Sequence, residues 1–234
     1  MRIFLLLWLA AFQIIAFTSI EHCEAGTWRD NFEDAITTEW TIYNLNRQVE
    51  KWWVDKGEAV GQIFQKGFMS LWLTGDLNWK NYSLSCRAKL VKEKNEPASL
   101  GFTLYDRGDE DMRYLFFVNF TLGTVSIVKA TPDAWFVRRF PFVAEMDTWY
   151  NFKAVVNEQE LEFWINDEVF IGRDLEPFKS GQAGLVVSNA QARFDDVEIT
   201  GDNIKDGGPG RIRPVNLRGK LTTTWGHVKT SIIR

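Results

Sequence analysis

Histidine and cysteine are scarce in this chain. Its 234 residues include two histidines, His22 and His227, and two cysteines, Cys23 and Cys86. Because His22 and Cys23 lie in an N-terminal segment that we expect to be removed, the mature chain keeps one of each. A single cysteine excludes an intramolecular disulfide. A single histidine excludes metal sites built on paired histidines and disfavours a Ser-His-Asp triad. The hydrophobic core alone must therefore stabilise the fold.

Residues 1–25 have the features of a secretory signal peptide. The short basic start Met1-Arg2 precedes the apolar run Ile3–Phe17, and Cys23-Glu24-Ala25 places small residues where a signal peptidase reads them. The run is shorter than the roughly 20 residues that span a bilayer, which disfavours a membrane anchor. We expect cleavage after Ala25, no membrane span in the mature chain, and a secreted protein that is extracellular, periplasmic or on the cell surface.

Charge is unevenly distributed along the chain, whose formal net charge is −4. Residues 201–234 contain seven basic and two acidic residues, whereas residues 26–200 contain 19 basic and 27 acidic residues. An acidic body lacks the basic surface that nucleic-acid binding requires, so we expect no nucleic-acid partner. Residues 201–219 are rich in glycine and proline and read as a linker, and residues 220–234 read as a basic C-terminal tail.

The body of the sequence predicts strands throughout. Tyr82–Leu90 alternates without a fault between apolar and polar residues, as a half-buried antiparallel strand does. Thirteen further short segments, separated by turn residues, are predicted strands: Trp40–Tyr43, Trp52–Val54, Glu58–Phe64, Ser70–Thr74, Ser99–Tyr105, Arg113–Phe120, Thr124–Ala130, Trp135–Phe140, Tyr150–Asn157, Glu160–Asn166, Val169–Arg173, Ala183–Asn189 and Arg193–Thr200. Many short strands without helices predict an all-β fold, an antiparallel β-sandwich of the jelly-roll type.

The residue patterns of two of these strands also predict what each face of the strand contacts. Arg113–Phe120 is apolar on both faces, which is typical of a central strand covered by a second sheet on one side and by a loop or ligand on the other. In Glu160–Asn166 the apolar residues Leu161, Phe163 and Ile165 point inward. The alternation therefore directs Trp164 to the solvent face.

An ordered set of motifs resembles one superfamily of sandwich proteins. The motifs are Trp28-Arg29-Asp30-Asn31-Phe32, Trp53-Val54 with Gly57, Gly123-Thr124-Val125-Ser126-Ile127, Trp149-Tyr150-Asn151-Phe152-Lys153, Leu161–Asp167, Gly181-Gln182-Ala183-Gly184-Leu185 and Phe194-Asp195-Asp196-Val197. Over roughly residues 28–200 this order resembles the concanavalin A-like lectin/glucanase superfamily. It looks most like the laminin-G-like and 3-keto-disaccharide hydrolase-type domains of secreted bacterial proteins. The resemblance implies a jelly roll, a fold that hosts lectins, glycosidases, lyases and adhesion modules alike.

The tryptophans predict a surface for sugar binding. Ten remain after cleavage, and pyranose rings stack their C–H faces on exposed aromatic planes while their hydroxyls need fixed polar partners. We assign Trp28, Trp40, Trp72 and Trp149 to the core, and Trp52, Trp79, Trp135 and Trp164 to the binding surface. A polar rim beside the central strand is expected from Asp106, Arg107, Asp109, Asp111 and Arg113. For each single tryptophan, partial burial in the core is the competing interpretation.

Catalytic carboxylates are harder to find. Glycoside hydrolysis usually needs two carboxyl groups that face one bond. The related glucanases carry Glu-x-Asp-x-x-Glu on one strand, but Glu145-Met146-Asp147 is followed by Tyr150 at the final position. If the protein is an enzyme, the candidates are Asp106, Asp109, Asp111 and Glu162. The absence of a paired-carboxylate strand favours binding without cleavage.

The resemblance also implies a possible structural calcium ion, although the expected function requires no cofactor. Superfamily relatives can tie the N-terminal segment to the last strand through hard oxygen ligands. In this sequence Asp30 and Glu33 near the start, with Asp195 and Asp196 near the end, resemble that arrangement. The competing interpretation is that Asp30 caps a turn and that the later pair faces water.

The sequence thus predicts a secreted, non-catalytic, lectin-like module whose partner is an oligo- or polysaccharide. Two alternatives remain open. One is a glycoside hydrolase or lyase acting on modified disaccharides, as the 3-keto-disaccharide hydrolase resemblance implies. The other is a structural adhesion module whose basic tail docks on an acidic partner. The sequence sets no oligomeric state.

Overall fold

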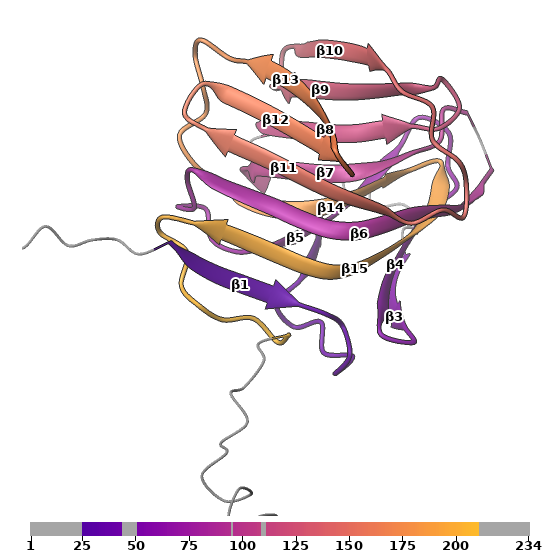
Figure 1. Cartoon of the computed structure of the whole chain (residues 1–234), viewed down its shortest axis with the longest axis horizontal. Coiled ribbons are helices and arrows are strands. Elements are labelled where there is room, and N and C mark those ends of the chain that lie inside the picture. Colours follow the sequence, from indigo (N-terminus) through magenta and orange to yellow (C-terminus); the bar gives the residue numbers. More distant parts are fainter. Residues whose placement is uncertain (1–24, 44–50, 95, 109–110, 211–234) are drawn as a thin grey trace, which may run out of the picture.

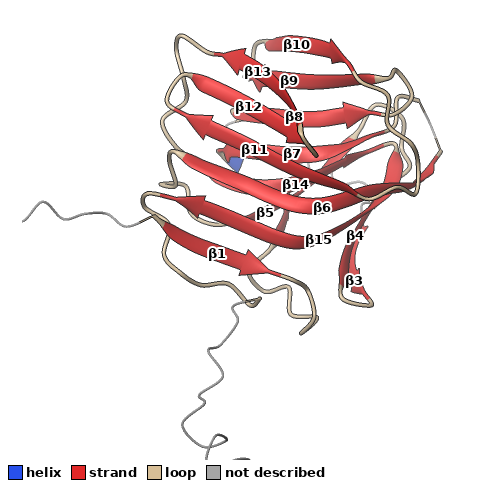
Figure 2. Ribbon diagram, viewed as in Figure 1, coloured by secondary structure: helices blue, strands red, loops and turns tan. Residues whose placement is uncertain are grey.

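Two antiparallel sheets face each other in the computed structural model, which describes residues 25–43, 51–94, 96–108 and 111–210 (Figures 1 and 2). The eight-stranded sheet has the order β13 (Glu168–Arg173), β12 (Glu160–Ile165), β11 (Tyr150–Asn157), β6 (Tyr82–Glu93), β15 (Ala190–Gly201), β4 (Glu58–Ile63), β3 (Lys51–Asp55), with β1 (Gly26–Asp30) also paired to β15. The seven-stranded sheet has the order β10 (Trp135–Pro141), β9 (Thr124–Ala130), β8 (Arg113–Asn119), β7 (Ser99–Asp106), β14 (Gln182–Ser188), β5 (Met69–Thr74), β2 (Thr41–Tyr43).

The predicted all-β sandwich is confirmed, and each of the fourteen predicted strands has a counterpart. The largest differences are at the ends: β6 continues to Glu93 and β15 begins at Ala190. Strand β1 was not predicted. Nearly all of the expected signal peptide and the basic tail lie outside the described residues. In the part of the chain that the structure describes, no helix is long and apolar enough to cross a bilayer.

Alternation along each strand places the core between the sheets. In β6, Tyr82, Leu84, Cys86, Ala88 and Leu90 are buried, while the residues between them face outward. The inward residues of both layers form one apolar cluster rich in phenylalanine. The free thiol of Cys86 lies inside this cluster, where burial raises its pKa well above the ordinary value. Cys86 is therefore an inert core residue.

Stacked tryptophans fill one end of the core. The ring of Trp72 lies 4.7 Å from Trp40 and 5.2 Å from Trp52, and Trp28 meets Trp40 edge to face. The core assignments of Trp28, Trp40 and Trp72 are confirmed by their burial. Trp149 differs, because it is partly exposed and carries the cationic group of Arg87 over its ring at 5.2 Å.

The outer face of the seven-stranded sheet also holds buried apolar residues. A second cluster of buried residues lies there, namely Leu71, Leu73, Leu115, Val128 and Val186, with Tyr43, Met69 and Phe117 packed against it. Strand β8 contributes Phe116 to the main core and Leu115 to this second cluster. Both faces of this central strand are therefore buried, as expected, and the loop or ligand over its outer face stays a prediction.

Residues 202–210 do not leave the body as the predicted linker. They run back along β1, where the Arg29 N–H donates to the Gly207 carbonyl at 3.0 Å and the Gly210 N–H donates to the Arg29 carbonyl at 3.0 Å. Ile204 is buried in the core. The glycines make this approach possible, since a Cβ on Gly208 would lie 2.0 Å from the Arg29 carbonyl oxygen. The folded body thus extends to residue 210.

Candidate functional site

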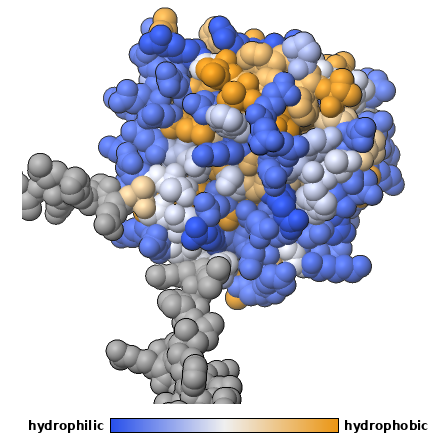
Figure 3. Space-filling view, viewed as in Figure 1, coloured by the Kyte–Doolittle hydropathy of each residue, from blue (hydrophilic) through white to orange (hydrophobic). Residues whose placement is uncertain are grey.

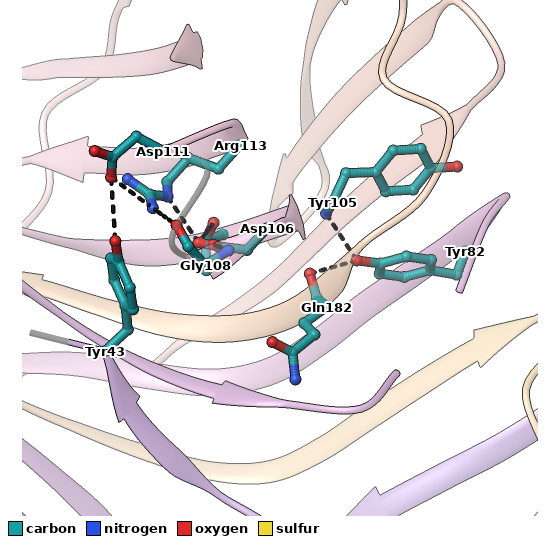
Figure 4. Close-up of polar contacts among 9 residues, drawn as sticks. Tyr43, Tyr82, Tyr105, Asp106, Gly108, Asp111, Arg113 and Gln182 are labelled. Carbon is teal, nitrogen blue, oxygen red and sulfur yellow. Dashed lines mark hydrogen bonds and ion pairs between the residues drawn. The ribbon is translucent and has the colours of Figure 1, made fainter. Parts of the chain in front are cut away.

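The loop after β7 is pinned by a buried ion pair. The Asp106 side chain is 0% exposed, and its carboxylate accepts hydrogen bonds from Arg113 Nε at 2.8 Å, Thr103 Oγ1 at 2.9 Å and the Gly108 N–H at 2.8 Å (Figure 4). Arg113 continues to the Gly108 carbonyl at 3.2 Å. Burial raises the pKa of Asp106, and the adjacent guanidinium of Arg113 opposes that rise. Both oxygens are occupied, so Asp106 positions the loop.

Tyr43 and Asp111 close the outer side of this ion pair (Figure 4). The Tyr43 hydroxyl donates to Asp111 Oδ1 at 3.3 Å, Arg113 Nη2 donates to the same oxygen at 3.3 Å, and the guanidinium lies 5.1 Å from the Tyr43 ring. Arg107 is partly buried in the same loop, and Asp109 lies outside the described residues. The structure therefore brings Asp106, Asp111 and Arg113 together as a closed cluster and not as the open rim that we predicted.

A second polar contact joins the two layers. The buried Tyr82 hydroxyl of β6 accepts from the Tyr105 N–H at 2.9 Å and donates to the Gln182 carbonyl at 2.9 Å (Figure 4). Burial raises the pKa of Tyr82 well above its ordinary value, which keeps the phenol protonated. Trp79 packs edge to face on this tyrosine and is buried. Its predicted place on the binding surface is therefore wrong.

Trp52 is also not free for a ligand. Its ring stacks on Trp72, and its Nε1 donates to Ser70 Oγ at 2.6 Å. The six-membered ring also fills the space above Gly61, where a Cβ would lie 2.5 Å from Trp52 Cη2. We correct this assignment, because Trp52 belongs to the edge of the core. Trp135 is exposed, but it lies on β10 in the opposite sheet from Trp164.

A groove that includes Trp164 in its lining lies on the outer face of the eight-stranded sheet. Its volume is about 560 Å³. Strand register explains its lining: Lys153 of β11 is directly opposite Trp164 of β12 on one side and Ser85 of β6 on the other. Residues opposite each other in antiparallel strands share a face, so these three side chains form one row across the sheet.

A second row borders the first. Asn151 is opposite Arg87, and the Asn151 N–H donates to Asn166 Oδ1 at 2.9 Å. Arg87 is held by Asp195 and by Asp196, whose Oδ2 lies 3.1 Å from Arg87 Nε. Asn151, Asn166, Arg87 and Asp196 all line the groove. The tryptophan is thus surrounded by amide, amine, guanidinium and carboxylate groups.

The orientation of Trp164 is fixed by a neighbour on its own strand. The indole Nε1 donates to Glu162 Oε2 at 2.7 Å, and both side chains are on the outer face. This bond holds the indole ring at the groove and occupies one carboxylate oxygen of Glu162. The predicted solvent-facing placement of Trp164 is confirmed. Glu162 lies on the opposite sheet from Asp106, so the four proposed catalytic residues do not form one set.

Sequence reasoning missed the residues that surround Trp164, which are Ser85, Asn151, Lys153 and Asn166. Alternation in each strand places the first three on the outer face and could have marked them as candidates. Which of them are neighbours depends on the register between β6, β11 and β12, and that register is not readable from one strand at a time.

The four predicted calcium ligands are not gathered at one point. Asp30 points inward, where its Oδ1 accepts from the Phe32 N–H at 2.8 Å and its Oδ2 accepts from Trp40 Nε1 at 2.7 Å. Asp195 and Asp196 bind Arg87 on the outer face, and Glu33 is exposed near Gly57. Within the described ranges, no three acidic, histidine or cysteine side chains form a metal-binding group. A calcium ion stays a prediction.

Comparison with solved structures identifies the fold. The carbohydrate-binding module CBM66 from Bacillus subtilis aligns with a TM-score of 0.59 at 19% identity, over 69% of this chain and 95% of its own. The fold is the concanavalin A-like jelly roll. A Bacillus licheniformis β-glucanase aligns with a TM-score of 0.59 at 10% identity, over 75% of this chain and 98% of its own.

A third solved structure, SCLam, a non-specific endo-β-1,3(4)-glucanase from family GH16, aligns with a TM-score of 0.56 at 11% identity, over 76% of this chain and 91% of its own. By sequence, the chain matches no family profile and no curated protein. At these identities the likeness defines the architecture alone, so the function must be argued from the site.

Proposed function

We propose that the protein binds carbohydrate without cleaving it and that the groove around Trp164 is the binding site. The observation that carries the proposal is a partly exposed indole ring, fixed by Glu162 and ringed by hydrogen-bonding side chains. Sugar-binding sites combine these two elements, an aromatic plane for the C–H face and polar groups for the hydroxyls.

The row of Trp164, Lys153 and Ser85 suits a sugar ring laid across the strands. The indole supplies the apolar platform, and the Lys153 ammonium donates to hydroxyl or carboxylate oxygens on one side. Asn151 and Asn166 offer amide donors and acceptors along the next row. The strands fix the backbone of these groups, so the conformational entropy lost on binding is mainly that of side chains such as Lys153.

Several contacts favour binding over hydrolysis. A glycosidase needs two carboxyl groups about 5–10 Å apart across the scissile bond. At the groove, Glu162 accepts from Trp164 and Asp196 is paired with Arg87. Asp106, on the other sheet, has both oxygens bound by its own loop and strand. These carboxylates are engaged in structural contacts and are not poised as an acid and a nucleophile.

The comparisons add support of a general kind. CBM66 is named as a carbohydrate-binding module, and this chain covers 95% of it. The expected signal peptide supports a site of action outside the cytoplasm, where polysaccharides are found. We therefore propose that the protein is exported and recognises an extracellular or surface glycan.

A panel of soluble polysaccharides in affinity gels, followed by calorimetry on the best ligand, tests the proposal. We expect Trp164→Ala to weaken binding by about 30-fold or more, as truncation of a central aromatic contact does. Trp164→Phe should retain part of the affinity. Trp135→Ala is the matched control, because it removes an exposed tryptophan from the other sheet.

Equal affinity of Trp164→Ala and the unaltered protein would overturn the site. Release of reducing sugar from the bound glycan would overturn the non-catalytic assignment. Loss of binding in Trp135→Ala with retention in Trp164→Ala would move the site to the opposite sheet.

A further inference from the structure

Strand β10 is the outermost strand of the seven-stranded sheet, and its residues are largely exposed. Trp135 is 53% exposed, Phe136 63% and Val137 41%. Figure 1 shows no other described strand beyond it, and Figure 3 shows apolar atoms gathered at the end of the molecule where β10 and β13 lie. A long, apolar, uncovered edge strand is a template for pairing with another strand.

The hydrogen-bond pattern identifies the backbone groups on the free edge. At the two ends of the β9–β10 ladder, the Thr131 N–H donates to the Ala134 carbonyl and the Phe142 N–H donates to the Gly123 carbonyl. Bonding alternates along an antiparallel pair, so the even-numbered residues of β10 bond to β9. The N–H and C=O groups of Trp135, Val137 and Arg139 therefore point away from the sheet.

The side chains on this edge are complementary to their own copies. When two β10 strands pair antiparallel about a two-fold axis at Val137, Val137 faces Val137 of the second copy and Trp135 faces Arg139. The arginine guanidinium then lies beside the indole of the other copy, an attractive cation–π pairing that forms twice. On the other face of the ribbon, Phe136 lies opposite Arg138, whose guanidinium donates to the Ile171 carbonyl of its own chain at 3.4 Å.

Other registers lose this complementarity. A two-fold axis at Arg138 would oppose Arg138 to its own copy, and like charges directly opposite each other are destabilising. An axis at Phe136 would leave Arg139 facing Asp133, beyond the start of the strand, and would shorten the ladder. The axis at Val137 uses all three free N–H groups and makes about six main-chain hydrogen bonds.

We propose that the protein forms a homodimer through β10, with Val137 on the two-fold axis and the two seven-stranded sheets joined into one. The exposed apolar edge becomes covered, and Pro141, which has no N–H, lies at the end of the ladder where it interrupts nothing. The groove at Trp164 lies on the other sheet and remains open in each copy.

The test is the mass in solution of the full chain and of charged variants at position 137. Analytical ultracentrifugation across the micromolar range should show a species of twice the mass of one chain, which is 27.1 kDa before the expected signal peptide is removed. Val137→Glu and Val137→Lys should each be monomeric, with dimer dissociation constants raised about 100-fold or more, because each puts two like charges in contact on the axis.

The decisive part of the experiment is to mix Val137→Glu with Val137→Lys. Glutamate on one copy faces lysine on the other, so the mixture should recover the dimer mass as a heterodimer. Val143→Glu, which changes a side chain 84% exposed outside the strand, should stay dimeric. Circular dichroism of each variant checks folding. A monomeric unaltered chain, a Val137→Glu variant that still dimerises, or a mixture that stays monomeric would each overturn the proposal.

Discussion

The guanidinium of Arg113 is buried against the carboxylate of Asp106 on the outer face of the seven-stranded sheet, with Arg113 Nε 2.8 Å from Asp106 Oδ2. Their position beside the central strand made both residues candidates for a binding rim, because charged side chains at such a place can serve a ligand. Their burial and internal contacts give them another role. They hold the loop after β7 in place by hydrogen bonds to Thr103 and Gly108.

Removing one partner of this pair should be costly. We expect Arg113→Met to lower the free energy of unfolding by about 3–5 kcal/mol, because it leaves the Asp106 carboxylate buried without its counter-charge. Urea denaturation measures this change. Arg29→Met, which breaks the exposed ion pair with Glu198, is the control and should cost less than about 1 kcal/mol. Similar losses in both variants would contradict a structural role for the buried pair.

Asp30 should make stability depend on pH. Burial raises its pKa from 3.8 to about 6, although Trp40 and the Phe32 N–H donate hydrogen bonds to the carboxylate. A raised pKa means that the folded state holds its proton more tightly than the unfolded state. The resulting stabilisation is complete below pH 3.8 and is lost as pH rises through about 6, by about 3 kcal/mol at most.

The Asp30→Asn variant isolates this contribution. Asp147 and Asp174 have lowered pKa values, and their contributions rise with pH instead, so the total profile mixes both signs. We expect the difference in unfolding free energy between the unaltered protein and Asp30→Asn to change between pH 4 and pH 7 in favour of the variant. A difference that is flat over this range would show that Asp30 titrates normally.

At the scale of elements, residues 202–210 and β1 form a unit that closes the edge of the eight-stranded sheet. Their contact depends on glycine: Gly208 has a φ of +87° and would place a Cβ 2.0 Å from the Arg29 carbonyl oxygen. Gly67 has a similar φ of +82°, but nothing lies within 4 Å of its Cβ position. The two glycines share a left-handed backbone conformation and differ in the space around the Cβ position.

This pair gives a matched comparison. Gly67→Ala should lose only the energy of a left-handed alanine, about 1 kcal/mol, whereas Gly208→Ala should lose at least about 1–2 kcal/mol more and release residues 202–210 from β1. Chemical denaturation measures the loss of stability in each variant. Limited proteolysis within residues 202–210 measures the release of this segment from β1. Equal stability and equal protease resistance in the two variants would contradict a docked segment.

The strands were predictable because their signal is local. Tyr82–Leu90 alternates along its own length, and the central strand is apolar on both faces, so neither requires knowledge of a neighbour. Strand β1 was missed because five residues beside the expected cleavage site carry little pattern. The docking of residues 202–210 was missed because Gly207 and Trp28 meet only after the sheet has formed.

At the scale of the whole molecule, the site was predictable only in part. The outward direction of Trp164 follows from the alternation of β12, and this prediction is confirmed. Trp52 and Trp79 were misassigned, because a count of tryptophans cannot show which rings pack against Trp72 or Tyr82. Lys153 and Asn151 join the site only through the pairing of β11 with its two neighbours. Long-range register is the information that the sequence pattern lacks.

The two proposals divide the molecule between its sheets. The eight-stranded sheet presents the groove at Trp164, and the seven-stranded sheet presents the edge strand β10. A failure of dimerisation leaves the sugar proposal intact, because the groove contains no residue of β10. A failure of sugar binding likewise leaves the dimer intact.

Hydroxyl-radical footprinting of the protein with and without a bound polysaccharide locates the sugar-binding face, since it reports the accessibility of each tryptophan at once. We expect the glycan to protect Trp164 and to leave the labelling of Trp135 unchanged. Protection of Trp135 alone, or unchanged labelling of Trp164 at saturating glycan, would contradict this expectation.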